Sequence, residues 1–192
     1  MDVETELTVA CLPPAVERLA LDILAHIRTH YQLGLKRKLE CYFAIYHAYR
    51  ELQLVCNDVE LALLFGVVTD GNKMRTMTKK ILKTYYRAGY PPPLTIYEPA
   101  DYVPITCEAI NMAHGDRPRI LSLVGRVLER FPDLATVAPG IVAAGVVAFY
   151  ANVVVGGKPV DAKVLLETVG INAKHVPILD RVVARAEETH MG

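Results

Sequence analysis

The sequence predicts an all-α protein that consists of two tandem five-helix domains. Apolar residues recur at three- and four-residue spacing along most of its 192 residues, and the alternation that marks strands is weak. The chain also matches itself at an offset of 104 positions, without a gap, from residue 16 to residue 67. Such a match indicates a duplicated domain, although helical sequences share a period and can also match by chance.

The two copies share glycines and small residues as well as apolar positions. Ala44-Ile45-Tyr46 lies over Ala148-Phe149-Tyr150, and Gly66 lies over Gly170. A shared helical period can explain matching apolar positions, but it explains matching glycines and a matching Ala-x-Tyr step less easily. The repeat therefore favours two domains of roughly 95 residues, each near the lower size at which a core is stable alone.

Five helices are expected in the first copy, over residues 3–10, 13–30, 36–54, 59–65 and 73–87. The second of them opens with two prolines, which suit a first helical turn. The third is apolar or small almost all round, which is typical of a central helix packed by several neighbours. Asn57 and Asp58 are expected to cap the short fourth helix, and Gly66 to end it.

The second copy repeats this order, with helices expected over residues 101–113, 118–130, 139–155, 160–168 and 174–188. Gly156-Gly157 is expected to break the central helix, and Gly170 to end the short one. The predicted domains are thus residues 1–90 and 101–192. Four prolines make the linker between them, residues 91–100, stiff and extended.

The composition excludes several classes of protein. An apolar fraction of 52% and a charged fraction of 22% are those of a folded chain, and no apolar run is long enough to span a membrane. The four cysteines form no C-x-x-C pair, so neither a zinc module nor a redox motif is indicated. The acidic N-terminus lacks the features of a signal peptide, which favours an intracellular location. A net charge of zero argues against bulk attachment to nucleic acid, but not against a local basic surface.

Five helices repeated twice resemble the core of transcription initiation factor IIB, in which each half is a cyclin box. The third helix of that family is rich in small residues and carries an Ala-x-x-Tyr-x-Ala type of step, to which Ala44-Ile45-Tyr46-His47-Ala48 is similar. The short helix that ends in a glycine turn before the last helix looks like the family's helix-turn-helix. The Leu12-Pro13 opening is similar as well, and the resemblance covers about residues 3–190.

The resemblance implies a non-enzymatic factor that bridges double-stranded DNA, a TATA-binding-protein-like or polymerase subunit, and the transcription machinery. It implies a location in the nucleus or at another site of transcription, such as a cytoplasmic viral factory, or in a virion. Family members also begin with a zinc ribbon and a loop that enters the polymerase cleft. Neither pattern precedes the first copy here, so recruitment of a polymerase by that route is not expected.

The most basic segment is the last helix of the first copy, the recognition helix that the resemblance implies. It contains Lys73, Arg75, Lys79, Lys80, Lys83 and Arg87, with no acidic residue among them. Such a row neutralises phosphates without choosing a sequence, and the solvated face of an ordinary helix is the alternative. The matching helix of the second copy offers three candidate contacts, Lys174, His175 and Arg181.

The second copy's last helix is less basic than the first copy's, and a further basic cluster lies elsewhere in the first copy. Pro177 and Asp180 make the second copy's helix a poorer DNA surface, so any nucleic acid is expected to contact mainly the first copy. Lys36-Arg37-Lys38 forms another basic cluster at the start of a helix, where cations oppose the helix dipole. Charges placed against the dipole suggest contact with an outside partner.

No catalytic, metal or cofactor site is predicted. His26 and His30 lie four residues apart, but no glutamate follows His26 as in the H-E-x-x-H pattern, so a surface pair is expected. His47 is expected to be an interior or interface residue. Asp101 and Asp116 are interpreted as helix caps. No P-loop, G-x-S-x-G or G-x-G-x-x-G is present, so neither an enzyme nor a small-molecule substrate is expected.

Two other functions stay open. A cyclin-like adapter would bind protein helices in the groove beside its central helix without contacting DNA, and the neutral net charge favours it. A structural protein, viral or part of another assembly, would retain the fold without its original task. The absent zinc ribbon and the weak second recognition helix fit that third hypothesis.

Overall fold

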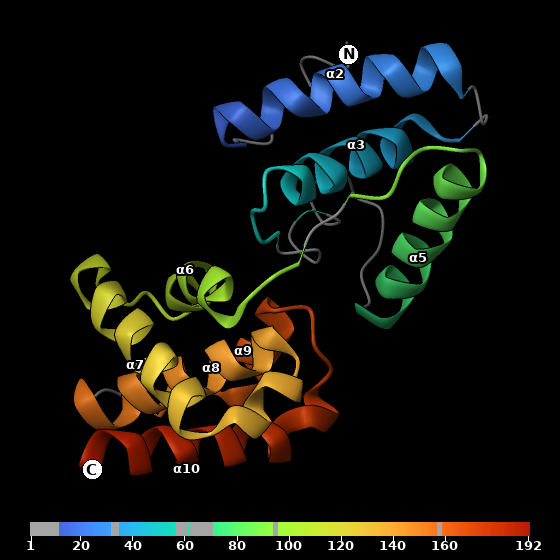
Figure 1. Ribbon diagram of the computed structural model, residues 1–192. Coiled ribbons are helices and arrows are strands. Elements are labelled where there is room, and N and C mark those ends of the chain that lie inside the picture. Colours follow the sequence, from blue (N-terminus) through green and yellow to red (C-terminus); the bar gives the residue numbers. More distant parts are fainter. Residues whose placement is uncertain (1–11, 32–34, 57–60, 62–70, 94–95, 157–158) are drawn as a thin grey trace. The chain divides into compact units, whose positions relative to one another are not determined.

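The computed structural model describes residues 12–31, 35–56, 61, 71–93, 96–156 and 159–192, without the side chains of residues 71–75. Within these ranges every regular element is a helix, which confirms the all-α class (Figure 1). The chain divides into two compact units, Met1–Ile96 and Tyr97–Gly192. The division falls inside the segment that the sequence predicts to be a linker, and each unit is described by itself below.

The first unit contains helices α2 (Pro14–His30), α3 (Arg37–Glu51) and α5 (Gly71–Arg87). These match the expected helices 13–30, 36–54 and 73–87 to within three residues at each end. The other predictions for this copy, the helices at 3–10 and 59–65 with their capping residues and Gly66, lie outside the described residues, except for Leu61.

Helix α3 is the centre of the first unit. Its eight residues from Cys41 to Ala48 are all buried, so the helix is covered on every side, as its composition predicts. Helix α2 packs on α3 through one stripe of buried residues, Val16, Ala20, Ile23, Leu24 and Ile27. This stripe has the three- and four-residue spacing that identifies the helix in the sequence.

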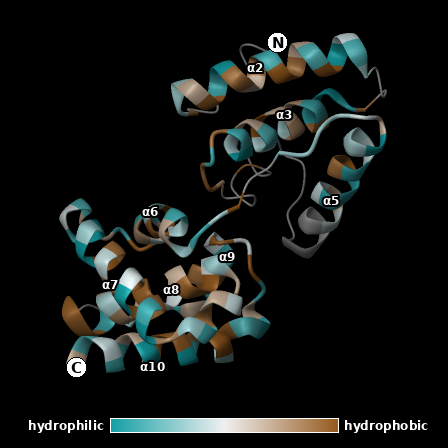
Figure 2. Ribbon diagram, in the orientation of Figure 1, coloured by the Kyte–Doolittle hydropathy of each residue, from teal (hydrophilic) through white to brown (hydrophobic). Residues whose placement is uncertain are grey.

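The second unit contains five α-helices among its described residues, as expected. They are α6 (Pro99–Ala109), α7 (Arg117–Arg130), α8 (Pro139–Phe149), α9 (Ala162–Thr168) and α10 (Val176–Met191). Helix α8 is buried along its length from Gly140 to Phe149, and no strongly hydrophilic residue lies on it (Figure 2). Helices α6 and α10 pack against α8, so α8 is the central helix of the second unit as α3 is of the first.

Several boundaries differ from the expected ones, among them the end of α6, which stops at Ala109 and not at residue 113. Helix α6 begins at Pro99, inside the predicted linker, because Glu98 and Asp101 form a reciprocal capping box there. Helix α8 ends at Phe149, and the chain continues as a π-helical turn, η3 (Tyr150–Val154), where one α-helix to residue 155 is expected. Helix α10 begins at Val176 after the 3-10 turn η4 (Ala173–His175) and continues to Met191.

The offset of 104 positions places helix over helix. Moved by this distance, α2 covers residues 118–134 and overlaps α7, while α5 covers residues 175–191 and coincides with α10. The cores correspond as well, because Leu61 and Leu165 are both buried at matching positions. This agreement in element bounds and burial supports the duplication that the sequence predicts.

Candidate nucleic-acid interface

One face of α5 carries a row of exposed cations. The described members of this row are Lys79, Lys80, Lys83 and Arg87, and all four side chains are exposed. With about 3.6 residues per turn, they occupy the side of the helix opposite the buried Thr78, Ile81 and Tyr85. We call these four residues the basic face. Lys73 and Arg75 lie in the first part of the same helix, but their side chains lie outside the described residues.

Two contacts to α3 set the rotation of α5 about its axis. The hydroxyl of Tyr42 lies 2.7 Å from Thr78 Oγ1 in the core. The ring of Tyr85 stacks on Phe43 with 4.0 Å between ring centroids, and burial raises the pKa of Tyr85 to about 12. Because both buried groups lie on the far side of α5, the basic face is directed to solvent.

The charge of the basic face is not compensated within the part of the chain that the structure describes. No carboxylate there lies within ion-pair distance of Lys79, Lys80, Lys83 or Arg87. The helix itself contains no acidic residue. Four uncompensated cations on one helix face form a surface that attracts phosphates or another polyanion.

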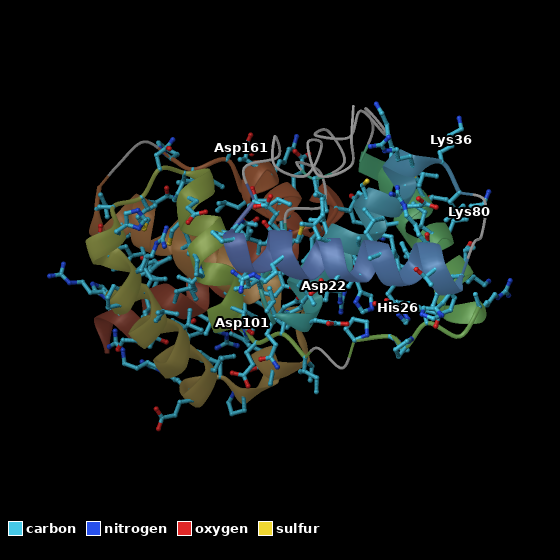
Figure 3. The ribbon with its side chains drawn as sticks, turned by 90° about the horizontal axis from the view of Figure 1, so that it is seen from above. Asp22, His26, Lys36, Lys80, Asp101 and Asp161 are labelled. Carbon is cyan, nitrogen blue, oxygen red and sulfur yellow. The ribbon has the colours of Figure 1, made fainter. Side chains whose placement is uncertain are left out.

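The second basic cluster of the first unit is also exposed. Lys36 is the N-cap of α3 and makes no capping hydrogen bond with its side chain, and Arg37 and Lys38 follow it in the first turn. Figure 3 shows Lys36 and Lys80 projecting from the ribbon at the same end of this unit. The two basic clusters predicted separately from the sequence are therefore both presented by the first unit.

The candidate contacts of the second unit lie in a mixed electrostatic environment. Lys174 is exposed and His175 half-buried in the turn η4, and Arg181 is exposed on α10. The same helix exposes Asp180, Glu187 and Glu188. The cations of α10 are interspersed with acids, unlike those of α5, so this helix does not form a comparable basic face.

The histidines fall where the sequence predicts. His26 and His30 are exposed neighbours on α2 with 4.5 Å between ring centroids. No group of three or more His, Cys, Asp or Glu side chains among the described residues is placed to hold a metal ion. The pair on α2 is a surface contact between two rings.

His47 is fully buried in α3 and joins that helix to the segment after α5. Its Nε2 lies 3.2 Å from the carbonyl oxygen of Pro91, which can only accept, so Nε2 carries the proton. Its Nδ1 lies 3.1 Å from Glu51 Oε1 without the geometry of a hydrogen bond. Burial lowers the pKa of His47 and outweighs the opposing effect of the Glu51 carboxylate.

The two aspartates that the sequence interprets as caps have different roles. Asp101 accepts a hydrogen bond from the backbone N–H of Glu98 at 2.8 Å, so it caps α6 as predicted. Asp116 is the N-cap residue of α7 but makes no capping hydrogen bond with its side chain. Its Oδ1 instead accepts a hydrogen bond from the Tyr150 hydroxyl at 3.2 Å, so Asp116 takes the predicted cap position without using its side chain as a cap.

A cavity in the second unit is a feature that the sequence analysis does not identify. It has a volume of about 440 Å³ and lies between α7, the turn η3 and the end of α10. Arg119, Ser122 and Arg126 line it from α7. These three residues are three and four positions apart, a spacing that places them on one face of a helix. This spacing is the signal in the sequence that could have grouped them.

Comparison with known proteins identifies no relative of this chain by sequence. No protein-family model and no curated protein sequence matches this chain. Among the described helices, none is both long and apolar enough to cross a membrane.

Proposed function

We propose that this protein is a non-enzymatic binding protein of the factor-IIB-like, tandem cyclin-box type, and that it contacts the phosphates of double-stranded DNA through the first unit. The observation that carries the proposal is the basic face of α5, formed by Lys79, Lys80, Lys83 and Arg87. It lies on the last helix of the first copy, where the resemblance places a recognition helix. Protein partners from the transcription machinery would bind elsewhere on the two units.

The chemistry of the basic face suits phosphates rather than base edges. Three of its four members are lysines, whose ammonium groups act as point charges without the planar geometry that reads a base pair. Contacts of this kind position a protein on DNA and supply affinity that falls steeply with salt. We therefore expect binding with little sequence preference from this surface alone.

The adapter without DNA binding is the second candidate. Residues 97–192 contain nine Lys and Arg against eleven Asp and Glu, so the second unit as a whole does not attract a polyanion. A tandem protein in which one unit binds DNA and the other binds protein reconciles both observations. The structural protein is the remaining candidate, and copy number in purified particles distinguishes it.

The test is duplex binding as a function of salt, measured by fluorescence anisotropy with the full chain. The test variant is Lys79→Glu with Lys80→Glu. We expect the slope of log affinity against log salt to become shallower by about 1.8, because each lost phosphate contact removes about 0.9. Affinity at low salt should fall by about tenfold or more.

The matched control is Arg18→Glu with Lys163→Glu, which changes the net charge equally. Arg18 on α2 and Lys163 on α9 are exposed and lie outside the basic face. The control should keep the wild-type slope. Equal slopes for the wild type and the test variant, or an equal loss in the control, would show that the basic face of α5 does not contact DNA. A pull-down that recovers protein partners but no DNA would then favour the adapter.

A further inference from the structure

The cavity in the second unit combines cationic side chains with an apolar wall. Arg119 and Arg126 enter it from one face of α7, seven residues and thus about 10 Å apart along the helix axis. Leu123 and Val154 supply apolar surface, and His190 lines the cavity from the end of α10. The cavity is open to solvent, because Arg119, Ser122 and Arg126 are exposed. Its volume lies within the range of about 300–1,000 Å³ of small-molecule sites, and its lining likewise combines apolar surface with a few polar groups.

The two arginines differ in their charged neighbours. Arg119 lies 3.9 Å from Asp116 Oδ1, and a hydrogen bond with the Tyr150 hydroxyl raises the pKa of Arg119. Arg126 makes no ion pair with any carboxylate in the described part of the chain, even though Glu129 follows one turn later. The cavity therefore holds one guanidinium that is partly compensated and one that is available to an anion.

The π-helical turn η3 shapes the wall opposite α7. The N–H of Val155 donates to the carbonyl oxygen of Tyr150 at 3.0 Å, five residues back, so the helix is locally wider than an α-helix. Such turns are rare and occur frequently at functional sites. This turn places Tyr150 and Val154 in the lining of the cavity.

The matching positions of the first copy carry neither the two arginines nor the π-helical turn. These features therefore do not follow from the fold that the two copies share. At the positions matching Arg119, Ser122 and Arg126 it has Ala15, Arg18 and Asp22. The segment matching η3 is residues 46–50, and α3 continues through it as a regular α-helix to Glu51. The two arginines and the π-helical turn are thus features of the second unit that the matching positions of the first copy do not share.

We infer that this cavity is a binding site for a small organic phosphate. Guanidinium groups pair with phosphate through two parallel hydrogen bonds, and the hydroxyl of Ser122 adds a donor beside them. The apolar wall of Leu123 and Val154 accommodates the organic part of the molecule. The inference concerns ligand binding alone, which is compatible with the proposed binding function.

The experiment is calorimetric titration of the full chain with adenosine monophosphate, inorganic phosphate and adenosine as probes. We expect the monophosphate to bind with a dissociation constant of about 1 mM or lower, more tightly than either fragment, because both parts of the cavity contribute. Arg126→Gln should weaken this binding by about tenfold or more, since it removes a charge-assisted pair. Ser122→Leu should also weaken it, by filling the cavity without changing the charge.

Lys163→Gln is the matched control, because it removes one cation from the same unit outside the cavity. It should bind the monophosphate as the wild type does, and unchanged thermal melting shows that each variant is folded. Absence of binding at millimolar concentrations, equal affinity for uncharged adenosine, or an equal loss in the control would overturn the inference. Duplex DNA could also displace the monophosphate, with a parallel loss of DNA affinity in Arg126→Gln. That result would overturn the inference too, because it would show that the cavity binds the phosphates of DNA and not a small organic phosphate.

The result is independent of the proposed function. The double reversal of Lys79 and Lys80 in the first unit should leave binding of the monophosphate unchanged. The cavity can therefore fail its test while the basic face passes, and the reverse also holds.

Discussion

Gly145 in α8 lies at a contact that leaves no room for a larger residue. A Cβ atom built on it would meet Val182 Cβ and Cγ1 on α10 at 2.6 Å and the carbonyl oxygen of Leu179 at 3.3 Å. Val182 is β-branched and fully buried, so its Cβ cannot move away without moving α10. Gly145→Ala should therefore force the two helices apart.

The expected magnitude follows from two opposing effects. Overpacking of a core costs about 1–3 kcal/mol, and a clash with a buried Cβ belongs to the upper part of that range. Replacing glycine by alanine inside a helix stabilises by about 1 kcal/mol. The net loss in free energy of unfolding is then about 1–2 kcal/mol. For a unit of this size, this corresponds to a fall in Tm of about 5–15 °C.

Gly125 in α7 is the matched control. It is exposed, and a Cβ atom there would meet nothing within 4 Å. Gly125→Ala should keep only the favourable effect and raise the Tm by a few degrees. Thermal melting followed by circular dichroism measures both variants. A Gly145→Ala protein that melts at or above the wild-type Tm would refute the close packing of α8 against α10.

Two further predictions concern the first unit. Tyr42→Phe removes the partner of the buried Thr78 hydroxyl, and we expect a loss of about 1–2 kcal/mol in urea unfolding. His47 has a lowered pKa in the folded state, so the unfolded chain binds its proton first as the pH falls. The stability that neutral His47 contributes is complete above pH 6.5 and decreases below it. His47→Gln should reduce the fall in unfolding free energy between pH 7 and pH 5, as urea titrations at both values would show; an unchanged fall would assign the dependence to other groups.

Local sequence signals account for the helices that were predicted well. Helix α2 has its apolar stripe and opening prolines, and α9 has its Asp161 cap and a glycine at φ +70° just beyond its end. These signals act within a few residues and depend little on the rest of the chain. The basic row of α5 is likewise visible in the sequence, because six cations without an acid need no tertiary information to be noticed.

Other features depend on contacts between segments that are far apart in the sequence. Apolar periodicity over residues 139–155 predicts one continuous helix, because the spacing of apolar residues does not distinguish an α-helical end from a π-helical one. The sequence predicts Asp116 as a helix cap, and the residue takes that position in α7. The use of its side chain is not predictable, because the Tyr150 hydroxyl lies within its reach only once α8 and η3 pack beside α7. The cavity requires α7, η3 and α10 together, so its residues share no single motif.

By itself, the sequence determined the all-helical class, the order of most helices and the presence of a basic row on α5, because periodicity, caps and charge are local properties. Only the tertiary structure decided the rotation of α5 that directs this row to solvent, since that rotation depends on the contacts of Thr78 and Tyr85 with α3. It also decided that Arg119 and Arg126 border a cavity rather than an open helix face. Side chains from three elements converge there only after the core of the second unit has packed.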